Sequence, residues 1–314
     1  MSGRGISKRG ERGGYAANAA GSTDEGSKDQ NGPDRLAPGL YLAATPIGAA
    51  NDVTLRALDA LARADVIAAE DTRRARQLMT IHGIEAGGRP IIPYHDHNGG
   101  AQRPKILARI EAGESVVCVS DAGTPLIADP GWRLAKDAIE RDLPVTALPG
   151  ASALLAALAI AGLPTDRFLF AGFLAPKRGA RLKELTELKD VPATLVFYES
   201  PRRLGAALAD MRDALGGARE AAVCRELTKL HEEARRGTLE TLADAYAEET
   251  PRGEIVLCVG PPRAEAPDEA ALDEVVAKAL KTMSPRDAAR FAAETLGVKR
   301  KDAYDRALSL KGAE

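Results

Sequence analysis

The sequence is short of several residue types, and each shortage excludes a class of protein. Only three of its 314 residues are cysteine, too few and too widely spaced for a disulfide framework or a cysteine zinc site. Cys118, Cys224 and Cys258 each sit in an apolar run, as buried small hydrophobic side chains do. This usage favours a reducing compartment, and we expect a cytoplasmic protein.

Long hydrophobic runs are also missing. The longest apolar stretch, residues 151–161, is too short to cross a bilayer as a helix. Residues 1–37 are rich in glycine, serine, asparagine and charge, and they have no apolar core of a secretory signal. We therefore expect no membrane segment and a disordered N-terminal extension over residues 1–37.

Neither a phosphate-binding loop nor a dinucleotide motif is present. No G-x-x-x-x-G-K-[ST] occurs, and no G-x-G-x-x-G follows the first strand, which disfavours nucleoside triphosphates and nicotinamide cofactors. The net charge is −2, so nucleic-acid binding would need a local basic patch. Aromatic residues make up 4%, too few for the stacking platforms that bind free single strands, so an RNA substrate would be an ordered shape.

Apolar β-type runs alternate with stretches of helical spacing between residues 38 and 162. This alternation predicts a first α/β domain with a parallel sheet and helices on both faces. The expected strands are 40–44, 66–69, 115–119 and 145–148, and the expected helices are 52–64, 72–82, 104–112, 132–141 and 151–161.

A second series follows a hinge at Gly162-Leu163-Pro164 and predicts a second α/β domain over residues 163–262. The expected architecture is therefore α/β, with two α/β domains, a ligand cleft between them and a linker with a small helical tail over 263–314. A break in the tail at Gly297 resembles a helix-turn-helix, although helices that merely pack on their own chain or on a partner are the more common arrangement. The expected strands are 168–172, 194–198, 221–224, 231–238 and 254–259; the expected helices are 180–188, 202–215, 240–248, 269–282 and 285–310.

The most informative stretch is the loop 120–131, which follows the apolar run 115–119. Acids, glycines and prolines begin where a buried strand ends, and open α/β sheets bind their ligands at the carboxyl ends of their strands. Asp121 supplies a fixed acceptor, and Gly123 lets a ligand approach the backbone. Because proline has no N–H donor, we expect carbonyl oxygens to face the ligand, an arrangement that suits a cationic sulfonium.

Three other strand ends, at 45–48, 149–152 and 198–203, have the same small, polar or proline residues. Together they predict one cleft between two domains, although each alone is also a normal strand stop. His95 and His97 flank an acid, but no third ligand cluster is evident, so we expect a polar loop near the cleft and no metal site.

Basic residues cluster after several of these loops, where they would suit RNA phosphates or else form solvated helix faces with salt bridges. The candidate RNA-binding residues are Arg73, Arg74, Lys177, Arg178, Arg202, Arg203, Arg225 and Lys229.

Several motifs stand in a fixed order along the chain: Ala44 to Gly48, Glu70-Asp71-Thr72-Arg73, His95-Asp96-His97-Asn98, Ser120 to Gly131, Leu148 to Ala153, Phe197 to Ser200, Arg225-Glu226-Leu227-Thr228-Lys229 and Gly253-Glu254. On these motifs the chain resembles the tetrapyrrole methylase superfamily, the class III S-adenosylmethionine methyltransferases, from about Gly39 to Pro262. It departs from the family pattern at Ala49, where asparagine is usual, and at Gly99, where an acid is frequent.

The resemblance implies a homodimer with S-adenosylmethionine bound between two α/β domains. Glu199 is also the first candidate for a catalytic base, although a salt bridge to Arg202 or Arg203 fits it equally well. The implied donor-binding residues share positions at strand ends: Pro46, Ile47, Gly48, Asp121, Ala122, Gly123, Thr124, Pro125, Ala151, Ser152, Leu174, Glu199, Gly253 and Glu254.

Within the superfamily, the chain is similar to members that methylate the ribose 2′-hydroxyl of cytidine 1402 in 16S ribosomal RNA of the small ribosomal subunit. Two alternatives stay open at this point. One is a methyltransferase of the same fold that acts on a tetrapyrrole or another small molecule. The other is a ribosome-assembly factor that binds RNA and the methyl donor without turnover.

Overall fold

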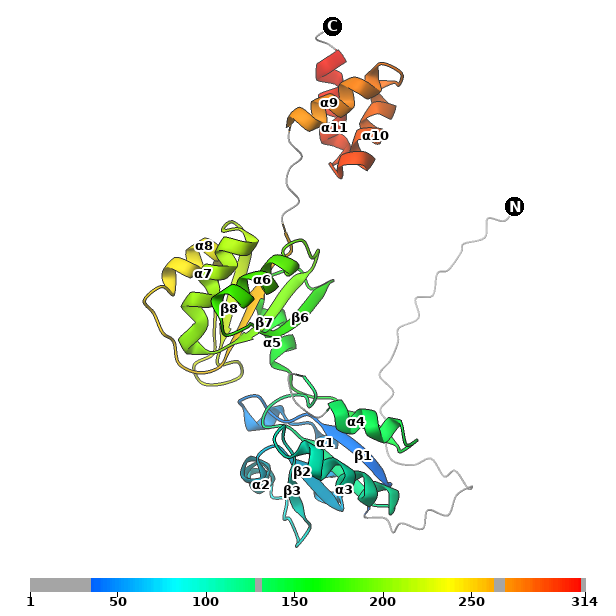
Figure 1. Cartoon of the computed structure of the whole chain (residues 1–314), viewed down its shortest axis with the longest axis vertical. Coiled ribbons are helices and arrows are strands. Elements are labelled where there is room, and N and C mark those ends of the chain that lie inside the picture. The colour runs from blue at the N-terminus through cyan, green and yellow to red at the C-terminus, as the bar shows by residue number, and fades with distance from the viewer. Residues whose placement is uncertain (1–34, 128–131, 263–268, 312–314) are drawn as a thin grey trace, which may run out of the picture.

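The computed structural model describes residues 35–127, 132–262 and 269–311. Residues 1–34 of the expected extension, residues 263–268 of the linker and residues 128–131 of the loop 120–131 lie outside these ranges. The described chain forms two α/β domains and a C-terminal group of helices (Figure 1). No helix within the described ranges is long and apolar enough to cross a membrane.

The first domain holds a five-stranded parallel sheet in the order β3-β2-β4-β1-β5. Helices α1 and α2 cover one face and α3 and α4 the other, as the hydrophobic clusters on the two faces show. The elements are β1 (Gly39–Ala43), α1 (Leu55–Arg63), β2 (Val66–Ala69), α2 (Thr72–Ile81), β3 (Ile91–Pro93), α3 (Gly99–Glu111), β4 (Ser115–Val119), α4 (Trp132–Ile139) and β5 (Val145–Leu148), with the 3-10 turn η1 at Ala50–Asp52.

The sequence predicts this sheet well because its central strands are buried on both faces. Every residue of β2 and β4 is buried, which explains their continuous apolar runs. The missed strand is β3, which has only three residues, lies at the sheet edge and includes Pro93. Proline is tolerated at such an edge but weakens the strand signal.

The order of the strands creates a crevice between β1 and β4, which are neighbours in the sheet. The chain leaves β1 toward α1 on one face and leaves β4 toward α4 on the opposite face. The two loops therefore diverge at their carboxyl ends, which is the topological switch point where open α/β sheets bind ligands.

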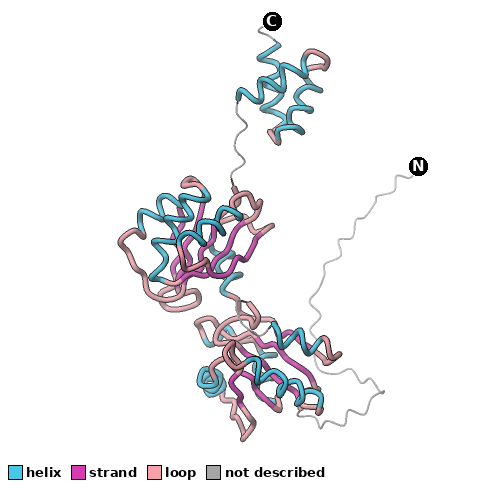
Figure 2. The backbone as a smooth tube through the Cα atoms, in the orientation of Figure 1, coloured by secondary structure: helices cyan, strands magenta, loops and turns pink. Residues whose placement is uncertain are grey.

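The second domain has a mixed sheet in the order β6-β7-β10-β8-β9, in which only the β6–β7 pair is parallel. Figure 2 shows its strands gathered into one sheet beside the helices. The elements are β6 (Phe168–Phe173), α6 (Arg178–Leu188), β7 (Thr194–Glu199), the 3-10 turn η2 (Pro201–Arg203), α7 (Leu204–Leu215), β8 (Glu220–Arg225), β9 (Glu233–Thr238), α8 (Leu239–Ala245) and β10 (Ile255–Val259).

Helix α5 (Ala153–Ala161) belongs to the second domain by its packing, although the sequence analysis counts it with the first. Its buried side chains join those of β7, β8 and β10 in one hydrophobic cluster, on the sheet face opposite α6, α7 and α8. Arg236 Nε also donates to Ile160 O at 3.1 Å. The helix lies where the two domains meet (Figure 1).

The C-terminal helices are α9 (Glu269–Leu280), α10 (Pro285–Leu296) and α11 (Arg300–Lys311). They share a small core of their own, which includes Val276, Ala292 and Ala307. Ser284 caps α10 through the amide of Asp287, and Gly297 ends it in the left-handed region. The expected helical tail and its break at Gly297 are thus confirmed.

We predict that Gly205→Ala destabilises the second domain. A Cβ at Gly205, the second residue of α7, would lie 2.5 Å from Tyr246 O, so the helix would have to shift at a cost of about 1–3 kcal/mol. Gly179, the second residue of α6, has open space around its Cβ position, and Gly179→Ala should leave stability unchanged or raised by up to about 1 kcal/mol. Urea unfolding of both variants checks this, and equal midpoints would contradict it.

Candidate functional site

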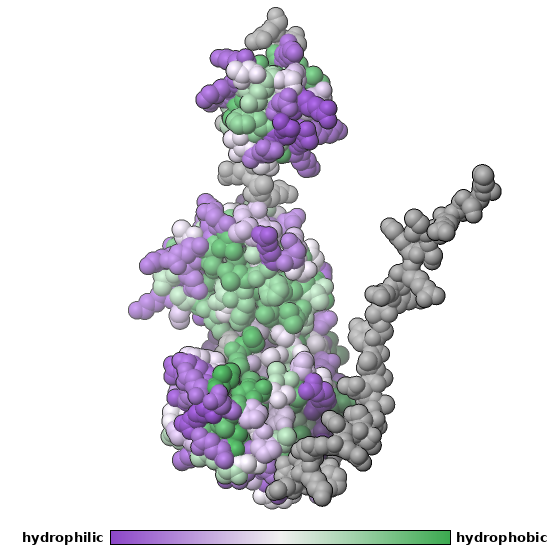
Figure 3. Space-filling view, turned by 90° about the vertical axis from the view of Figure 1, so that its right-hand side faces the viewer, coloured by the Kyte–Doolittle hydropathy of each residue, from purple (hydrophilic) through white to green (hydrophobic). Residues whose placement is uncertain are grey.

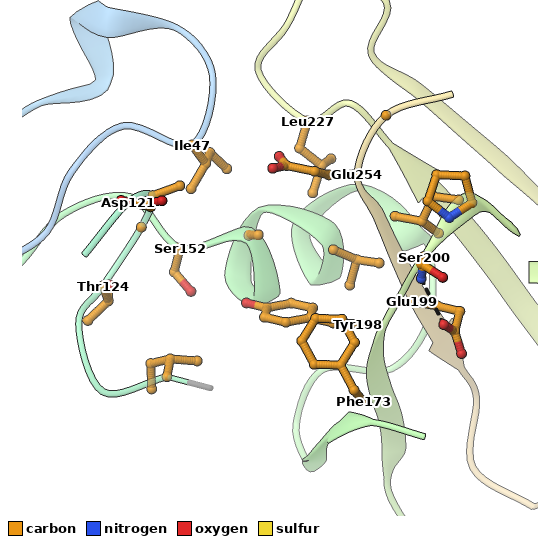
Figure 4. A pocket seen from close by; sticks show the side chains of 18 of the residues that line it. Ile47, Asp121, Thr124, Ser152, Phe173, Tyr198, Glu199, Ser200, Leu227 and Glu254 are labelled. Atoms are coloured by element: carbon orange, nitrogen blue, oxygen red, sulfur yellow. Dashed lines mark hydrogen bonds between the residues drawn. The ribbon is translucent and has the colours of Figure 1, made fainter. Parts of the chain in front are cut away.

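A cleft of about 500 Å³ opens between the two α/β domains, within the size range of small-molecule sites. Figure 4 shows Ile47, Asp121, Thr124 and Ser152 on one side, and Leu227, Glu254, Glu199 and Tyr198 on the other. Residues from the loops after β1, β4 and β5 thus face residues from β7, β10 and the loop after β8. The complete lining is Ile47, Glu70, Arg74, Asp121, Ala122, Gly123, Thr124, Ile127, Ser152, Ala153, Phe173, Tyr198, Glu199, Ser200, Pro201, Leu227, Gly253, Glu254, Ile255 and Val256.

On the first-domain side of the cleft, two backbone hydrogen bonds join the loops after β1 and β4. Thr45 N donates to Gly123 O at 2.9 Å, and Gly123 N donates to Thr45 O at 3.0 Å. Gly123 has φ +81°, and a Cβ there would lie 3.3 Å from Ile47 Cγ2. The bridge therefore needs glycine both for its conformation and for space.

The loop after β5 is tied to the same wall. Thr124 Oγ1 donates to Ala151 O at 3.0 Å, which joins the central loop to the start of α5. Leu126, two residues further on, has φ +76°, an uncommon conformation for a side chain of its size. Strain of this kind persists only where the surroundings fix the backbone, as at ligand sites.

Carboxylates dominate the polar lining next to this loop. Asp121 Oδ1 accepts from Asp71 N at 3.0 Å, and Asp121 Oδ2 lies 3.7 Å from Arg74 Nε. Asp71 caps α2 through Arg73 N, and hydrogen bonds from the side chain and amide of Arg73 lower the pKa of Asp71 to about 2. Asp71 therefore stays ionised in the physiological range.

On the second domain, Glu199 ends β7 with a fully buried carboxylate. Its Oε1 accepts from Ser200 N at 2.7 Å, and its Oε2 lies 3.3 Å from Arg203 Nη2 without the alignment of a hydrogen bond. Tyr198 packs edge-on against Phe173, with ring centroids 5.6 Å apart, and both rings line the cleft.

A second charged cluster surrounds Lys229. Its Nζ donates to Glu226 Oε1 at 2.8 Å and to Glu254 Oε2 at 2.9 Å. Burial alone lowers the pKa of Lys229, but these two bonds outweigh burial and raise the pKa above its ordinary value. The bond from Lys229 and the amide of Glu254 lower the pKa of Glu226. Gly253 has φ +96°, and a Cβ there would lie 2.3 Å from Glu226 Cδ.

The two domains touch at Gly48. A Cβ at this position would lie 2.5 Å from Lys229 Cγ and 2.6 Å from Thr228 Oγ1. The next residue, Ala49, donates its N–H to Thr228 Oγ1 at 3.1 Å. Thr228 has φ +62°, so the backbone of this segment is itself constrained. The width of the cleft on this side therefore depends on a glycine.

Comparison with known proteins decides the family. The family model for tetrapyrrole (corrin/porphyrin) methylases matches residues 39–243, which is most of the chain. The chain belongs to the tetrapyrrole methylase family. The model for the RsmI C-terminal HTH domain also matches residues 266–311.

Relatives in the methylase family align over nearly their whole length. The chain is 52% identical to "Ribosomal RNA small subunit methyltransferase I" of Mesorhizobium japonicum, over 88% of this chain and 93% of that one. It is 45% identical to the protein of the same name from Mycobacterium tuberculosis, over 86% and 94%.

Solved structures share the methylase fold at low identity. They include cobalt precorrin-4 methyltransferase (TM-score 0.54, 20% identity, 70% of this chain and 94% of that one) and the methyltransferase CobJ (0.55, 22%, 71% and 94%). These likenesses show the fold alone.

The cleft of this methylase contains most of the donor-binding residues named from the sequence. Those that line it are Ile47, Asp121, Ala122, Gly123, Thr124, Ser152, Glu199, Gly253 and Glu254. The others lie beside it in the same loops, outside the lining: Pro46, Gly48, Pro125, Ala151 and the buried Leu174.

The sequence analysis missed several lining residues. The sequence carries a signal for Phe173 and Tyr198, because each lies at or next to the end of an apolar strand. Glu70 and Leu227 belong to motifs that the chain shares with the family, but they are not among the donor-binding residues named from the sequence. The described residues include no cluster of histidine, cysteine and acidic side chains able to hold a metal.

Most of the basic residues named for RNA contact have acidic partners. Six of the eight form ion pairs, and Arg74 also lines the cleft. Lys177 and Arg202 are exposed and form no ion pair with any residue in the described ranges. The interpretation of these residues as salt-bridge partners is therefore correct for most of them, and it includes the expected pairing of Glu199 with Arg203.

We predict that Gly48→Ala loosens the contact between the domains. The added methyl group would meet Lys229 and Thr228, so the hydrogen bond from Ala49 N to Thr228 Oγ1 should break. Hydrogen–deuterium exchange should then rise in peptides covering 46–50 and 226–230. Gly100→Ala, with open space around it, is the matched control. Unchanged exchange in Gly48→Ala would contradict the contact.

Proposed function

We propose that this protein transfers a methyl group from S-adenosylmethionine to the 2′-hydroxyl of a cytidine ribose in 16S ribosomal RNA of the small ribosomal subunit. The observation that carries the proposal is a carboxylate-lined cleft at the topological switch point of a tetrapyrrole methylase, in a chain about half identical to curated ribosomal RNA methyltransferases. A ribosomal substrate would place the protein in the cytoplasm.

The residues of the cleft fit S-adenosylmethionine, which supplies a methyl group on a positively charged sulfur. Glu70, Asp121, Glu199 and Glu254 line the cleft, and the last three pair with Arg74, Arg203 and Lys229. Glu70 forms no ion pair within the described ranges, so the lining keeps one uncompensated carboxylate for a cationic ligand. Gly123 has no side chain that would keep a ligand from the backbone.

The start of α5 suits the carboxylate of the donor's methionine part. Ser152 and Ala153 line the cleft, and the Ser152 side chain does not cap the helix. The N–H groups of the first helical turn therefore lack a side-chain acceptor from their own cap, and they carry the partial positive charge of the helix end. They would bind the carboxylate at the side of the cleft nearest Thr124.

Positioning accounts for most of the proposed catalysis. The ribose oxygen bonds to the methyl carbon as the carbon–sulfur bond breaks, its electron pair stays on sulfur, and the hydroxyl proton leaves to water or a base. Because the methyl group is already activated, fixing both partners within the cleft can supply about 7–11 kcal/mol at best. The bridge between Thr45 and Gly123 and the Gly48 contact are the features of this chain that fix the two walls.

We also propose a homodimer that buries the edge of the second sheet. Phe168 and Leu169 of the edge strand β6 are 43% and 37% exposed, and Leu155 of α5 is 55% exposed. Figure 3 faces this side of the molecule, where hydrophobic residues gather over the second domain. An exposed apolar strand edge invites pairing with another chain, and a second copy supplies an identical edge.

The test of the reaction uses purified protein, tritiated S-adenosylmethionine and small subunits from a strain without this gene. We expect label on one cytidine ribose of 16S RNA, and a loss of about 10–100-fold in Asp121→Asn, which removes a charged acceptor from the cleft. Asp59→Asn, on the exposed side of α1, should keep full activity. Donor binding without label on subunits or naked 16S RNA would instead support a small-molecule acceptor or a non-catalytic assembly factor.

The dimer is tested by light scattering after size-exclusion chromatography. Phe168→Glu places a charge on the edge strand and should give a monomer where the wild-type chain gives a dimer. Leu230→Glu, at a residue that is 93% exposed in the loop between β8 and β9, is the control and should stay dimeric. A monomeric wild-type chain would refute the proposal.

A further inference from the structure

Two loops of the second domain meet at the edge of the cleft. One follows β6 and leads from Phe173 to α6, and the other follows β7 and contains η2. Because β6 and β7 are parallel neighbours, their carboxyl ends lie at the same edge of the sheet. Phe173 and Pro201, one from each loop, both line the cleft.

Arg203 joins the two loops. Its Nη2 donates to Leu174 O at 2.6 Å and to Ala175 O at 3.2 Å, and the same nitrogen lies 3.3 Å from Glu199 Oε2. A guanidinium between a buried carboxylate and two carbonyl oxygens has its charge compensated on both sides. The carboxylate of Glu199 thus keeps Arg203 in place, and Arg203 keeps the first loop in place.

A second ion pair, which is buried and formed by residues of α6 and α7, contacts the same loop. Arg181, which is 5% exposed, pairs with Asp210 at 2.6 Å and also lies within 3.4 Å of Ala175 O. Glu184 Oε2 accepts from Ala175 N at 3.1 Å. Both backbone polar groups of Ala175 are therefore bound by buried or half-buried side chains, which leaves this loop little freedom.

The two loops held in this way carry the two exposed cations named above. Lys177 precedes α6 directly, and Arg202 is the middle residue of η2. Both are exposed, and neither pairs with an acid in the described ranges. Their loops contribute Phe173 and Pro201 to the lining of the cleft, so both cations are free to bind phosphate next to it.

We propose that Glu199 is a positioning residue that acts through Arg203, and that the two tied loops present Lys177 and Arg202 as a phosphate-binding pair for the RNA backbone at the cleft. This inference rests on the proposed function, because it assumes an RNA acceptor. The alternative role for Glu199, a base for the hydroxyl proton, fits less well. Its Oε1 is occupied by Ser200 N, and its Oε2 faces a guanidinium.

The phosphate-binding pair is tested first with the double variant Lys177→Gln/Arg202→Gln. Its KM for small subunits should rise while kcat and the Kd for S-adenosylmethionine stay unchanged. The slope of log KM against log salt concentration should fall by about 2, one for each lost phosphate contact. Lys183→Gln, at an exposed lysine of α6, is the matched control. A double variant that behaves like this control would overturn the pair.

Glu199→Gln then separates positioning from proton transfer. We expect a higher KM for subunits, faster hydrogen–deuterium exchange over 174–177 and an unchanged pH profile of kcat. A base would instead show a kcat loss of about 10²–10⁴-fold and the disappearance of the acidic limb of that profile, which would overturn the assignment.

Failure of the proposed function is distinguishable from failure of this inference. If the wild-type chain methylates no subunit, the RNA proposal fails by itself. Exchange over 174–177 still decides whether Glu199 fixes the loop, and unchanged exchange in Glu199→Gln would refute it.

Discussion

The pairing of Thr45 with Gly123 is the interaction on which the rest of the site depends. It joins the loops after β1 and β4, whose strands are neighbours and whose chains leave toward opposite faces of the sheet. Without a tie, such diverging loops would leave an open crevice. The two backbone hydrogen bonds set the depth of that crevice, and the positive φ of Gly123 makes them possible.

The second domain closes the crevice partly through a sterically demanding contact at Gly48. The Cβ atom that any other residue would bring to position 48 would collide with Lys229 and Thr228. Lys229 is itself held by Glu226 and Glu254, which also lines the cleft. The docking of the domains and the electrostatics of the cleft therefore share residues, and a change to one alters the other.

Charge is divided between the inside of the cleft and its edge. Carboxylates line the inside of the cleft, where they suit a cationic donor. Most of the basic residues around them form ion pairs with these or other acidic side chains. Among the basic residues named for RNA contact, Lys177 and Arg202 are the two without an ion pair in the described ranges, and both lie outside the lining.

The sequence predicts those parts of the structure that depend on local pattern. Continuous apolar runs predict buried strands such as β2 and β4. The acid, glycine and prolines that follow β4 predict the loop at its end. Helix α5 is apolar on nearly all sides, so nothing in its sequence says which sheet it covers, and only tertiary packing assigns it to the second domain.

The partners of charged side chains are equally beyond local pattern. Arg178 pairs with Asp210, and Lys229 pairs with Glu254, across 32 and 25 positions of sequence. A basic cluster in the sequence therefore shows how many cations are present, but not which of them are paired with an acidic residue in the fold. This distinction decides the interpretation of the site, because a paired arginine beside a buried carboxylate fixes a loop, whereas an unpaired one on that loop is free to bind a phosphate. Arg203 and Arg202 are consecutive residues, and the fold pairs the first with Glu199 and leaves the second without an ion pair in the described ranges.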